Sequence, residues 1–347
     1  DINGDGLPDR VMRKGSAPYD RFKVQLNNGS GFGPLIDWSP LDSTYTDGYW
    51  NSPKASFNGI TQVDMHDVNG DGLIYRVMSQ GAAPFNKFRV QLNKGPFPDL
   101  LQNISNGIGG QVSVAYKVST EYDNRDRVWT GDPWSAGAKS LLPFPVWTVA
   151  SITSNDGLGN ISTNTYSYKN GMYSAAKKEF RGFNRVEVID PLGTKTITYF
   201  HQGGGIDQTT NGEYQDQTAK AKQGVPYRVE VWGSDGLKYT QTLNKVEETQ
   251  LHANGWTFPF VSQTIAMEYE GLGAYRAFAK QFTYDTATLN LTKESNLGEV
   301  ANVDVQNHTF SDVGTDDVYT HTAYATLSNP DIKNKPSSIK ITSDSGG

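Results

Sequence analysis

The residues that could do chemistry stand at the start of the chain, in a short run of oxygen-bearing side chains. Asp1, Asn3 and Asp5 alternate along this run, and Gly6 follows them and permits a sharp turn. Carboxylate and amide oxygens at this spacing suit a hard cation such as calcium. The sequence therefore predicts a metal ion that holds structure together.

A near copy of this loop returns 66 residues later, with Asp67, Asn69 and Asp71 at the same spacing. The copy carries Tyr75 where the first loop carries Asp9, so it lacks one carboxylate that could close a site. We expect the second loop to bind metal more weakly, with water in the gap, or to remain an empty turn. A plain turn is the alternative for either copy, because Asp, Asn and Gly favour turns. The duplication favours the metal at the first loop.

The duplication extends well beyond the loop. Residues 1–27 and 67–93 align without a gap and are identical at 17 of 27 positions, and both end in a strand-like phrase, at 22–27 and 88–93. An internal repeat predicts stacked or radially arranged units. A helical EF-hand needs a bidentate Glu at loop position 12, but a methionine stands there in both copies, and alternating segments follow. We therefore place the loops between β-strands.

The pattern D-x-N-x-D-G-x-x-D between strands resembles the FG-GAP (VCBS-type) repeats of calcium-binding β-propellers. The resemblance implies that one repeat supplies roughly one blade, with Asp1, Asn3, Asp5 and Asp9 around the ion and the Leu7 carbonyl completing the coordination. A propeller closes with about four to eight blades, and two repeats are visible here. We expect the chain to be a piece of a longer polypeptide.

After about residue 98 the chain becomes a series of short alternating segments with the period of β-strands. These segments lie at residues 110–116, 163–168, 185–188, 195–200 and 227–232. Turn signals separate them at residues 155–157, 169–171, 190–193 and 234–236. The pattern predicts a long antiparallel meander, and the fold class is all-β.

One stretch, residues 120–147, departs from the meander because it holds Trp129, Trp134 and Trp147 together with three prolines. Proline is poorly placed in a central strand, so we expect an ordered loop packed by its own aromatic side chains. A surface that contacts carbohydrate or a partner is the alternative for this stretch.

Longer phrases in the middle of the chain carry a second resemblance: LPFPV at 142–146, EFRGF at 179–183 and YFH at 199–201. Across residues 105–235 the sequence is similar to the middle region of the insecticidal toxin-complex (Tc) B component and its virulence-plasmid relatives. Residues 280–294 resemble a degenerate YD repeat of the Rhs type. The resemblance implies the wall of a β-shell in which B and C components enclose a toxic C-terminal region. It also implies a propeller that docks and gates toward a pore-forming A component.

The resemblance divides the chain into three parts. Residues 1–98 form FG-GAP/VCBS-type propeller repeats, residues 99–235 the toxin-complex B middle region, and residues 236–347 an Rhs/YD-like strand region. The toxic enzyme and the self-cleaving centre known in such shells are expected outside this chain. Secretion or display on the bacterial surface follows from the same family, and a calcium site is better saturated outside the cytosol.

The composition of the chain excludes several classes of function and chemistry. Lys and Arg number 31 against 37 Asp and Glu, so the net charge of −6 lacks the basic footprint that nucleic acid requires. The chain has no cysteine, which excludes disulfides and thiolate chemistry within it. No run of 18 apolar residues occurs, so we expect no membrane span.

Candidate catalytic residues are scattered. The five histidines show no metal-ligand spacing, and each is expected to be a surface or packed side chain: His66, His201, His252, His308 and His321. Asp123, Asp126 and Asp132 lie close in sequence, as a glycosidase pair could, but charge pairing within a loop is simpler. We predict a non-enzymatic delivery module. The alternative is a secreted, calcium-stabilised carbohydrate-active enzyme or glycan-binding adhesin.

Overall fold

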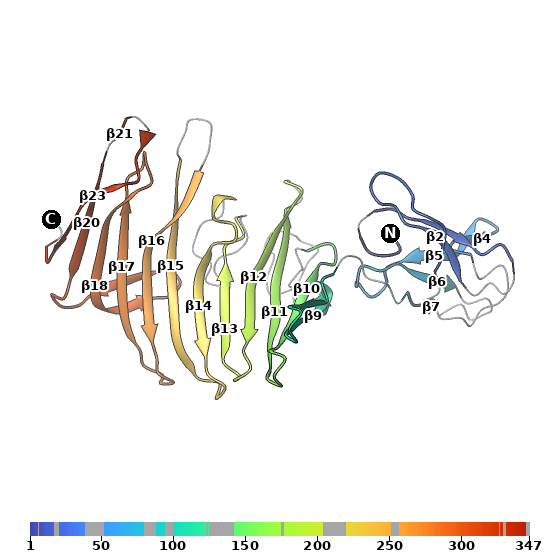
Figure 1. Cartoon of the computed structure of the whole chain (residues 1–347), viewed down its shortest axis with the longest axis horizontal. Coiled ribbons are helices and arrows are strands. Elements are labelled where there is room, and N and C mark those ends of the chain that lie inside the picture. The colour runs from blue at the N-terminus through green and yellow to red at the C-terminus, as the bar shows by residue number, and fades with distance from the viewer. Residues whose placement is uncertain are drawn as a thin grey trace. The chain divides into compact units, whose positions relative to one another are not determined.

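The chain is almost entirely β-structure in a computed structural model (Figure 1). The structure describes residues 1–5, 7–16, 21–38, 52–79, 88–93, 100–122, 124, 142–174, 177–203, 220–250, 257–325, 327–328 and 331–344. Within these ranges the only helical elements are two short 3₁₀ turns, η1 (Ser119–Glu121) and η2 (Lys220–Lys222). The all-β prediction is confirmed, and no described helix is long and apolar enough to cross a membrane.

The chain forms two compact units. The first comprises Asp1–Ile104, Tyr116–Glu121 and Phe144–Thr148, and the second comprises Ser105–Ala115, Tyr122–Pro143 and Val149–Gly347.

The first unit contains two small antiparallel sheets that follow the sequence repeat. One has the order β1 (Arg10–Arg13), β2 (Phe22–Gln25), β3 (Ile36–Trp38), and the other the order β4 (Ala55–Phe57), β5 (Ile60–His66), β6 (Tyr75–Ser79), β7 (Phe88–Gln91). Arg10 pairs with Gln25 in the first repeat, and Arg76 pairs with Gln91 in the second. Both partners are offset by 66 residues, so the repeat builds the same hairpin twice in the same register.

The hydrophobic core of the first sheet joins its hairpin to the loop that precedes it. Ile2, Phe22, Val24 and Trp38 are buried together, with Val11, Leu26 and Met65 packed against them. Because Ile2 lies between the first two acidic positions, the oxygen-rich loop is anchored in this core.

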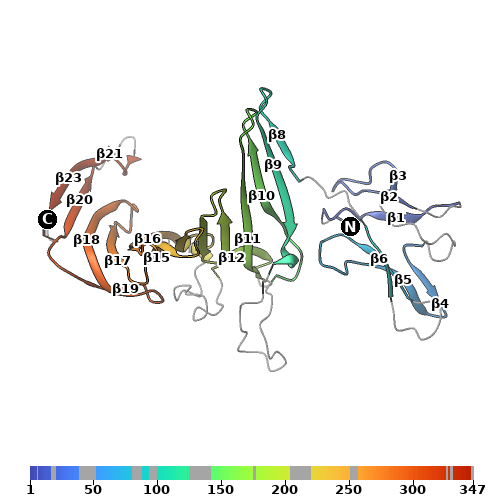
Figure 2. The same ribbon diagram turned by 90° about the horizontal axis from the view of Figure 1, so that it is seen from below.

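The second feature of the fold is a long antiparallel meander (Figures 1 and 2). Its strands, in the order in which they pair, are β8 (Asn103–Ser105), β9 (Gln111–Val118), β10 (Trp147–Asn155), β11 (Ile161–Ser174), β12 (Glu179–Ile189), β13 (Lys195–Phe200), β14 (Pro226–Trp232), β15 (Lys238–Gln250), β16 (Thr257–Glu268), β17 (Arg276–Tyr284), β18 (Leu291–Asp304), β20 (Val318–Tyr324) and β23 (Pro336–Thr342). The strand β19 (Thr309–Asp312) pairs beside β18, and β21 (Leu327–Ser328) pairs with β22 (Asp331–Ile332). The predicted meander is confirmed.

The connections of the meander differ between its two edges. Five-residue turns join β10 to β11, β12 to β13 and β14 to β15, and Figure 1 shows them along the lower edge of the sheet. The predicted turns at 190–193 and 234–236 lie in these connections, and the one at 155–157 begins at the last residue of β10. The six-residue connection between β17 and β18 lies at the opposite edge.

The predicted turn at 169–171 is wrong, because these residues lie inside β11. Asn170 takes a positive φ of 56°, and the register with β12 shifts just after it, which makes a β-bulge. A Cβ at Gly171 would lie 2.8 Å from Leu142 and 2.9 Å from Phe183. The Lys-Asn-Gly signal therefore serves a kink and a close approach, not a chain reversal.

The main hydrophobic core of the meander spans four strands. Leu243 pairs with Ile265 and Ile265 with Ala279, while Met267 pairs with Ala277 and Ala277 with Val300. Phe310 of β19 packs against this cluster. Complete burial of a Leu or Ile contributes about 1.5–3 kcal/mol each, so this cluster stabilises the centre of the sheet.

Candidate functional site

The first acidic loop brings together the carboxylates that its spacing predicts. One oxygen each from Asp1, Asp5 and Asp9 lies within 4.8 Å of the others. The backbone shapes the loop: Asp1 Oδ1 accepts from the Gly4 N–H (2.6 Å), and Asp5 Oδ1 accepts from the Leu7 N–H (2.8 Å). Gly4 has a positive φ of 76°, which glycine adopts without strain.

Two further features of this loop fit a bound cation. Asn3 is 7% exposed, and its Oδ1 atom is buried without a hydrogen-bond partner, while its Nδ2 donates to Asp5 Oδ2 (3.0 Å). A buried oxygen without a donor is costly, and a cation ligated there removes that cost. Asp9 is fixed by the N–H groups of Ile2 (2.7 Å) and Asn27 (2.8 Å). The donor set is all oxygen, as calcium prefers.

The second loop repeats two backbone bonds of the first, from Asp67 and Asp71, but has a different closure. Asp67 accepts from the N–H groups of Gly70 (2.7 Å) and Gly72 (2.9 Å). The buried Tyr75 donates its hydroxyl to Asp71, and Asn69 Nδ2 donates to the Tyr75 oxygen (2.9 Å). Burial, together with the bond to Asp71, raises the pKa of Tyr75 well above its ordinary value. A neutral hydroxyl thus satisfies the carboxylate of Asp71 where the first loop has a third acid, Asp9.

A buried asparagine links the two loops. Asn93 Nδ2 donates to the carbonyl of Ile2 in the first loop (2.6 Å) and to that of Ile74 after the second (3.4 Å). Its Oδ1 accepts from Trp38 Nε1 (2.9 Å) in the core. The repeat partner Asn27 makes the corresponding contact to Pro8 (3.3 Å). A shift of the first loop's backbone would therefore move Asn93 and, through it, the Trp38 side chain in the core.

The middle of the chain has a recognisable family signature. Residues 53–202 match the family model described as the insecticide toxin TcdB middle/N-terminal region. A comparison with curated protein sequences gave no match. The TcdB-like segment, residues 53–202, covers the second repeat and the meander from β8 through β13.

Solved structures share the fold over nearly the whole chain. The chain aligns over 98% of its length with the crystal structure of TcdB2-TccC3 without its hypervariable C-terminal region, at TM-score 0.70 and 18% identity. It aligns equally far with the Photorhabdus luminescens Tc holotoxin pore, at TM-score 0.64 and 16% identity. At such low identity the likeness shows the fold alone. The chain spans 19% of the first solved chain and 18% of the second.

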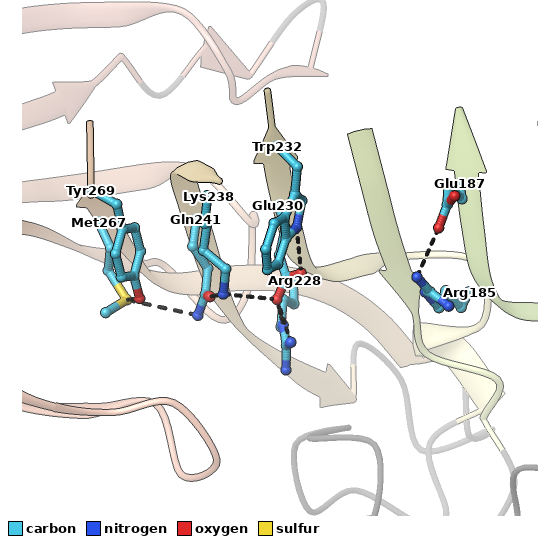
Figure 3. Close-up of polar contacts among 9 residues, drawn as sticks. All are labelled: Arg185, Glu187, Arg228, Glu230, Trp232, Lys238, Gln241, Met267 and Tyr269. Carbon is cyan, nitrogen blue, oxygen red and sulfur yellow. Dashed lines mark hydrogen bonds and ion pairs between the residues drawn. The ribbon is translucent and has the colours of Figure 1, made fainter. Parts of the chain in front are cut away.

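One face of the meander carries a polar network that the sequence analysis did not identify (Figure 3). Glu230 is 2% exposed and accepts from Arg228 Nε (2.7 Å), Trp232 Nε1 (3.0 Å) and Lys238 Nζ (3.4 Å). Burial opposes ionisation, but the charges of Arg228 and Lys238 outweigh it and lower the pKa of Glu230. The carboxylate stays ionised and paired, which suits a structural role better than proton transfer.

Cations and aromatic rings alternate around this network. Arg228 lies 4.5 Å from the centre of the Tyr199 ring, and Lys238 lies 5.0 Å from that of Trp232. On β12, Arg185 donates to Glu187 (2.8 Å). The signal for both pairs was present in the sequence, because RVEV occurs at 185–188 and again at 228–231. Alternate positions of a strand share one face, so Arg and Glu must lie together.

The histidines behave as surface or packed side chains. His66 is exposed and lies 3.9 Å from Asp64, whereas His201 and His308 are each 1% exposed. The His201 ring lies 4.9 Å from the ring of Tyr227. Burial lowers the pKa of His308 from 6.5 to about 4.

Several predicted features lie outside the described residues. These are the acidic trio, two of the loop tryptophans and one histidine: Asp123, Asp126, Asp132, Trp129, Trp134 and His252.

Proposed function

We propose that this chain is a structural, non-enzymatic part of a Tc-type toxin complex, within its B component. The observation that carries the proposal is the coincidence of two likenesses. Residues 53–202 match the TcdB family model, and the fold matches TcdB2-TccC3 over 98% of the chain. In this proposal the meander is a stretch of shell wall, and the first unit belongs to a propeller that gates the shell.

The chemistry of the sheet supports a wall more than a catalyst. The buried Glu230 is held between Arg228 and Lys238, and the exposed pair Lys280 and Glu294 joins neighbouring strands (2.7 Å). Polar groups that satisfy each other hold strands in register and leave little capacity for proton transfer to a substrate.

The proposed partners follow from the proteins that share the fold. The solved neighbours are a TcdB2-TccC3 complex and a Tc holotoxin pore. By likeness, this chain belongs to a B component that binds a C-component-like chain carrying a toxic region and docks on a pore-forming A component. A secreted location fits such an assembly.

We also propose that the first loop holds one structural calcium ion through Asp1, Asn3, Asp5 and Asp9, with Leu7 supplying a carbonyl. The clustered carboxylates and the buried Asn3 oxygen support this assignment. Asp67, Asn69 and Asp71 of the second loop form a turn closed by Tyr75, and we propose that they bind calcium weakly or not at all.

Co-expression of the full-length protein with the C-component-like chain of the same organism tests the assignment. The expected result is a stable one-to-one complex on size-exclusion chromatography, with a closed shell visible by cryo-electron microscopy. A full-length protein that stays alone, with the meander as an open sheet over a ligand cleft, would contradict the shell.

A further inference from the structure

Each of five turns along one edge of the meander exposes a large aliphatic side chain. These residues are Ile108, Leu158, Leu192, Leu237 and Leu272, and their exposed fractions range from 49% to 89%. They belong to the connections β8 to β9, β10 to β11, β12 to β13, β14 to β15 and β16 to β17. In an antiparallel meander, alternate connections lie at the same edge, as Figure 1 shows. We call these five residues the apolar rim.

Three of the four neighbouring pairs of turns that carry the apolar rim approach each other closely. A Cβ built on Gly157 would lie 2.6 Å from the backbone of Gly109 in the next turn. A Cβ on Gly193 would lie 2.9 Å from Ser234, and one on Gly271 would lie 3.5 Å from Leu237. Since strands are about 4.8 Å apart, successive tips recur roughly every 10 Å. The rim is therefore a row of regularly spaced tips along one edge of the sheet.

The geometry of the turns does not require apolar tips. In four of the five turns, an Asn or Asp side chain accepts the backbone N–H of the tip residue. The pairs are Asn106 with Ile108 (3.0 Å), Asp156 with Leu158 (2.7 Å), Asp190 with Leu192 (2.9 Å) and Asp235 with Leu237 (3.0 Å). This bond uses only the backbone of the tip, so a polar residue would serve the turn equally well. An aligned row of exposed apolar residues is typical of a contact surface.

The charge of the rim indicates what it contacts. The turn residues 106–110, 155–160, 190–194, 233–237 and 269–275 include four acids, Asp156, Asp190, Asp235 and Glu270, and neither Lys nor Arg. An anionic lipid surface or a nucleic acid would be repelled. A protein surface with basic side chains between apolar sockets is complementary.

We propose that the apolar rim is a docking surface for a protein partner that offers apolar sockets about 10 Å apart, flanked by Lys or Arg. The inference rests on the proposed function, because the partner for the test is the C-component-like chain. It assigns that chain a contact along the turn edge of the sheet.

The test compares full-length wild type with the variant Leu158→Ser, Leu192→Ser, Leu237→Ser in co-expression with the C-component-like chain. Because three apolar contacts are lost, the variant should bind more than about tenfold more weakly. The wild-type complex should also weaken as salt rises. Phe258→Ser is the matched control: Phe258 is 43% exposed at the opposite edge, so binding should stay unchanged.

Hydrogen exchange on the wild type gives a readout that needs no variant. Amides of 156–160 and 190–194 should become protected only when the partner is present. If wild type binds and the rim variant binds equally well, the rim contact is refuted while the proposed function stands. If the rim turns are already protected in the full-length chain alone, or the variant changes self-association instead, the occupant is the same polypeptide and the inference is wrong. If wild type captures no partner, the proposed function fails and the rim contact fails with it.

Discussion

His308 should make the meander lose stability as the pH falls through the weakly acidic range. The side chain is 1% exposed, and burial lowers its pKa from 6.5 to about 4, although a hydrogen bond to the Asn244 backbone acts in the opposite direction. The neutral ring is therefore stabilised in the folded state, while the unfolded chain takes up a proton near pH 6.5. The contribution of the neutral His308 ring to the free energy of unfolding is complete above pH 6.5, and it declines as the pH falls toward 4.

The size of this loss follows from the shift of the pKa. Each pKa unit corresponds to about 1.4 kcal/mol, so the change from 6.5 to about 4 removes about 3 kcal/mol of unfolding free energy. For the domain that contains β15 and β16, this is a large fraction of a typical total of about 5–15 kcal/mol. Gln263 Nε2 on β16 donates to the His308 carbonyl (2.6 Å), so β16 lies next to the group that titrates.

Urea unfolding at several pH values between 7.5 and 4.5 measures the effect, with hydrogen exchange of β15 and β16 as the local probe. His308→Gln should be less stable at pH 7.5 but should lose about 3 kcal/mol less than wild type on acidification. Phe310→Leu, on the same covering segment, is the control for lost packing and should keep the wild-type pH slope. Parallel pH curves for wild type and His308→Gln would falsify the assignment.

Three further predictions concern the loops and the sheet. Calcium at about 100 times its Kd should stabilise the first unit by about 2.7 kcal/mol in thermal unfolding. The substitution Asp9→Asn should abolish this stabilisation. If the variant were stabilised as much as wild type, the ion would bind elsewhere. Glu230→Gln should cost about 1.5–3 kcal/mol in urea unfolding, because two partly buried cations lose the buried carboxylate that they bond. A cost under about 1 kcal/mol would mean that water solvates both cations. Gly157→Ala should lower Tm more than Gly159→Ala. Both glycines have positive φ, but only a Cβ at Gly157 would collide with the backbone of Gly109 in the neighbouring turn. Equal decreases in Tm would refute the close packing of these two turns.

The sequence repeat predicted local structure down to the register, but it did not predict burial. Phe22 and Phe88 occupy the same position of the same hairpin, yet Phe22 is 1% exposed and Phe88 is 76% exposed. The strand β3 pairs with β2 and adds Trp38 to the cluster around Phe22. Among the described residues, β7 ends its sheet and has no such neighbour. Whether a side chain is buried depends on the residues from other parts of the chain that pack against it. A local sequence pattern does not specify those residues.

The same limit explains the error at residues 169–171. Lys-Asn-Gly is a sound local signal for positive φ, and Asn170 does adopt it. Whether the chain then reverses or continues depends on distant partners. The Gly171 N–H donates to Asn124 Oδ1 (3.0 Å), and Leu142 packs against Gly171, so the strand continues through a bulge. Both partners lie at least 29 residues away in sequence, beyond the reach of a turn rule.

The two acidic loops show why a motif match alone does not establish a metal site. Both follow D-x-N-x-D-G, and both fold the same Asx-type turn, with Asp1 bonded to Gly4 and Asp67 bonded to Gly70. The backbone is therefore stable with either closure, and the ninth position decides the chemistry. Asp9 adds a third clustered carboxylate, whose mutual repulsion a divalent cation relieves. Tyr75 instead supplies a hydroxyl donor, so the remaining acids are satisfied without an ion. If this reasoning is correct, Tyr75→Asp should create a second calcium site in the same turn, and isothermal titration should then show two ions per chain instead of one.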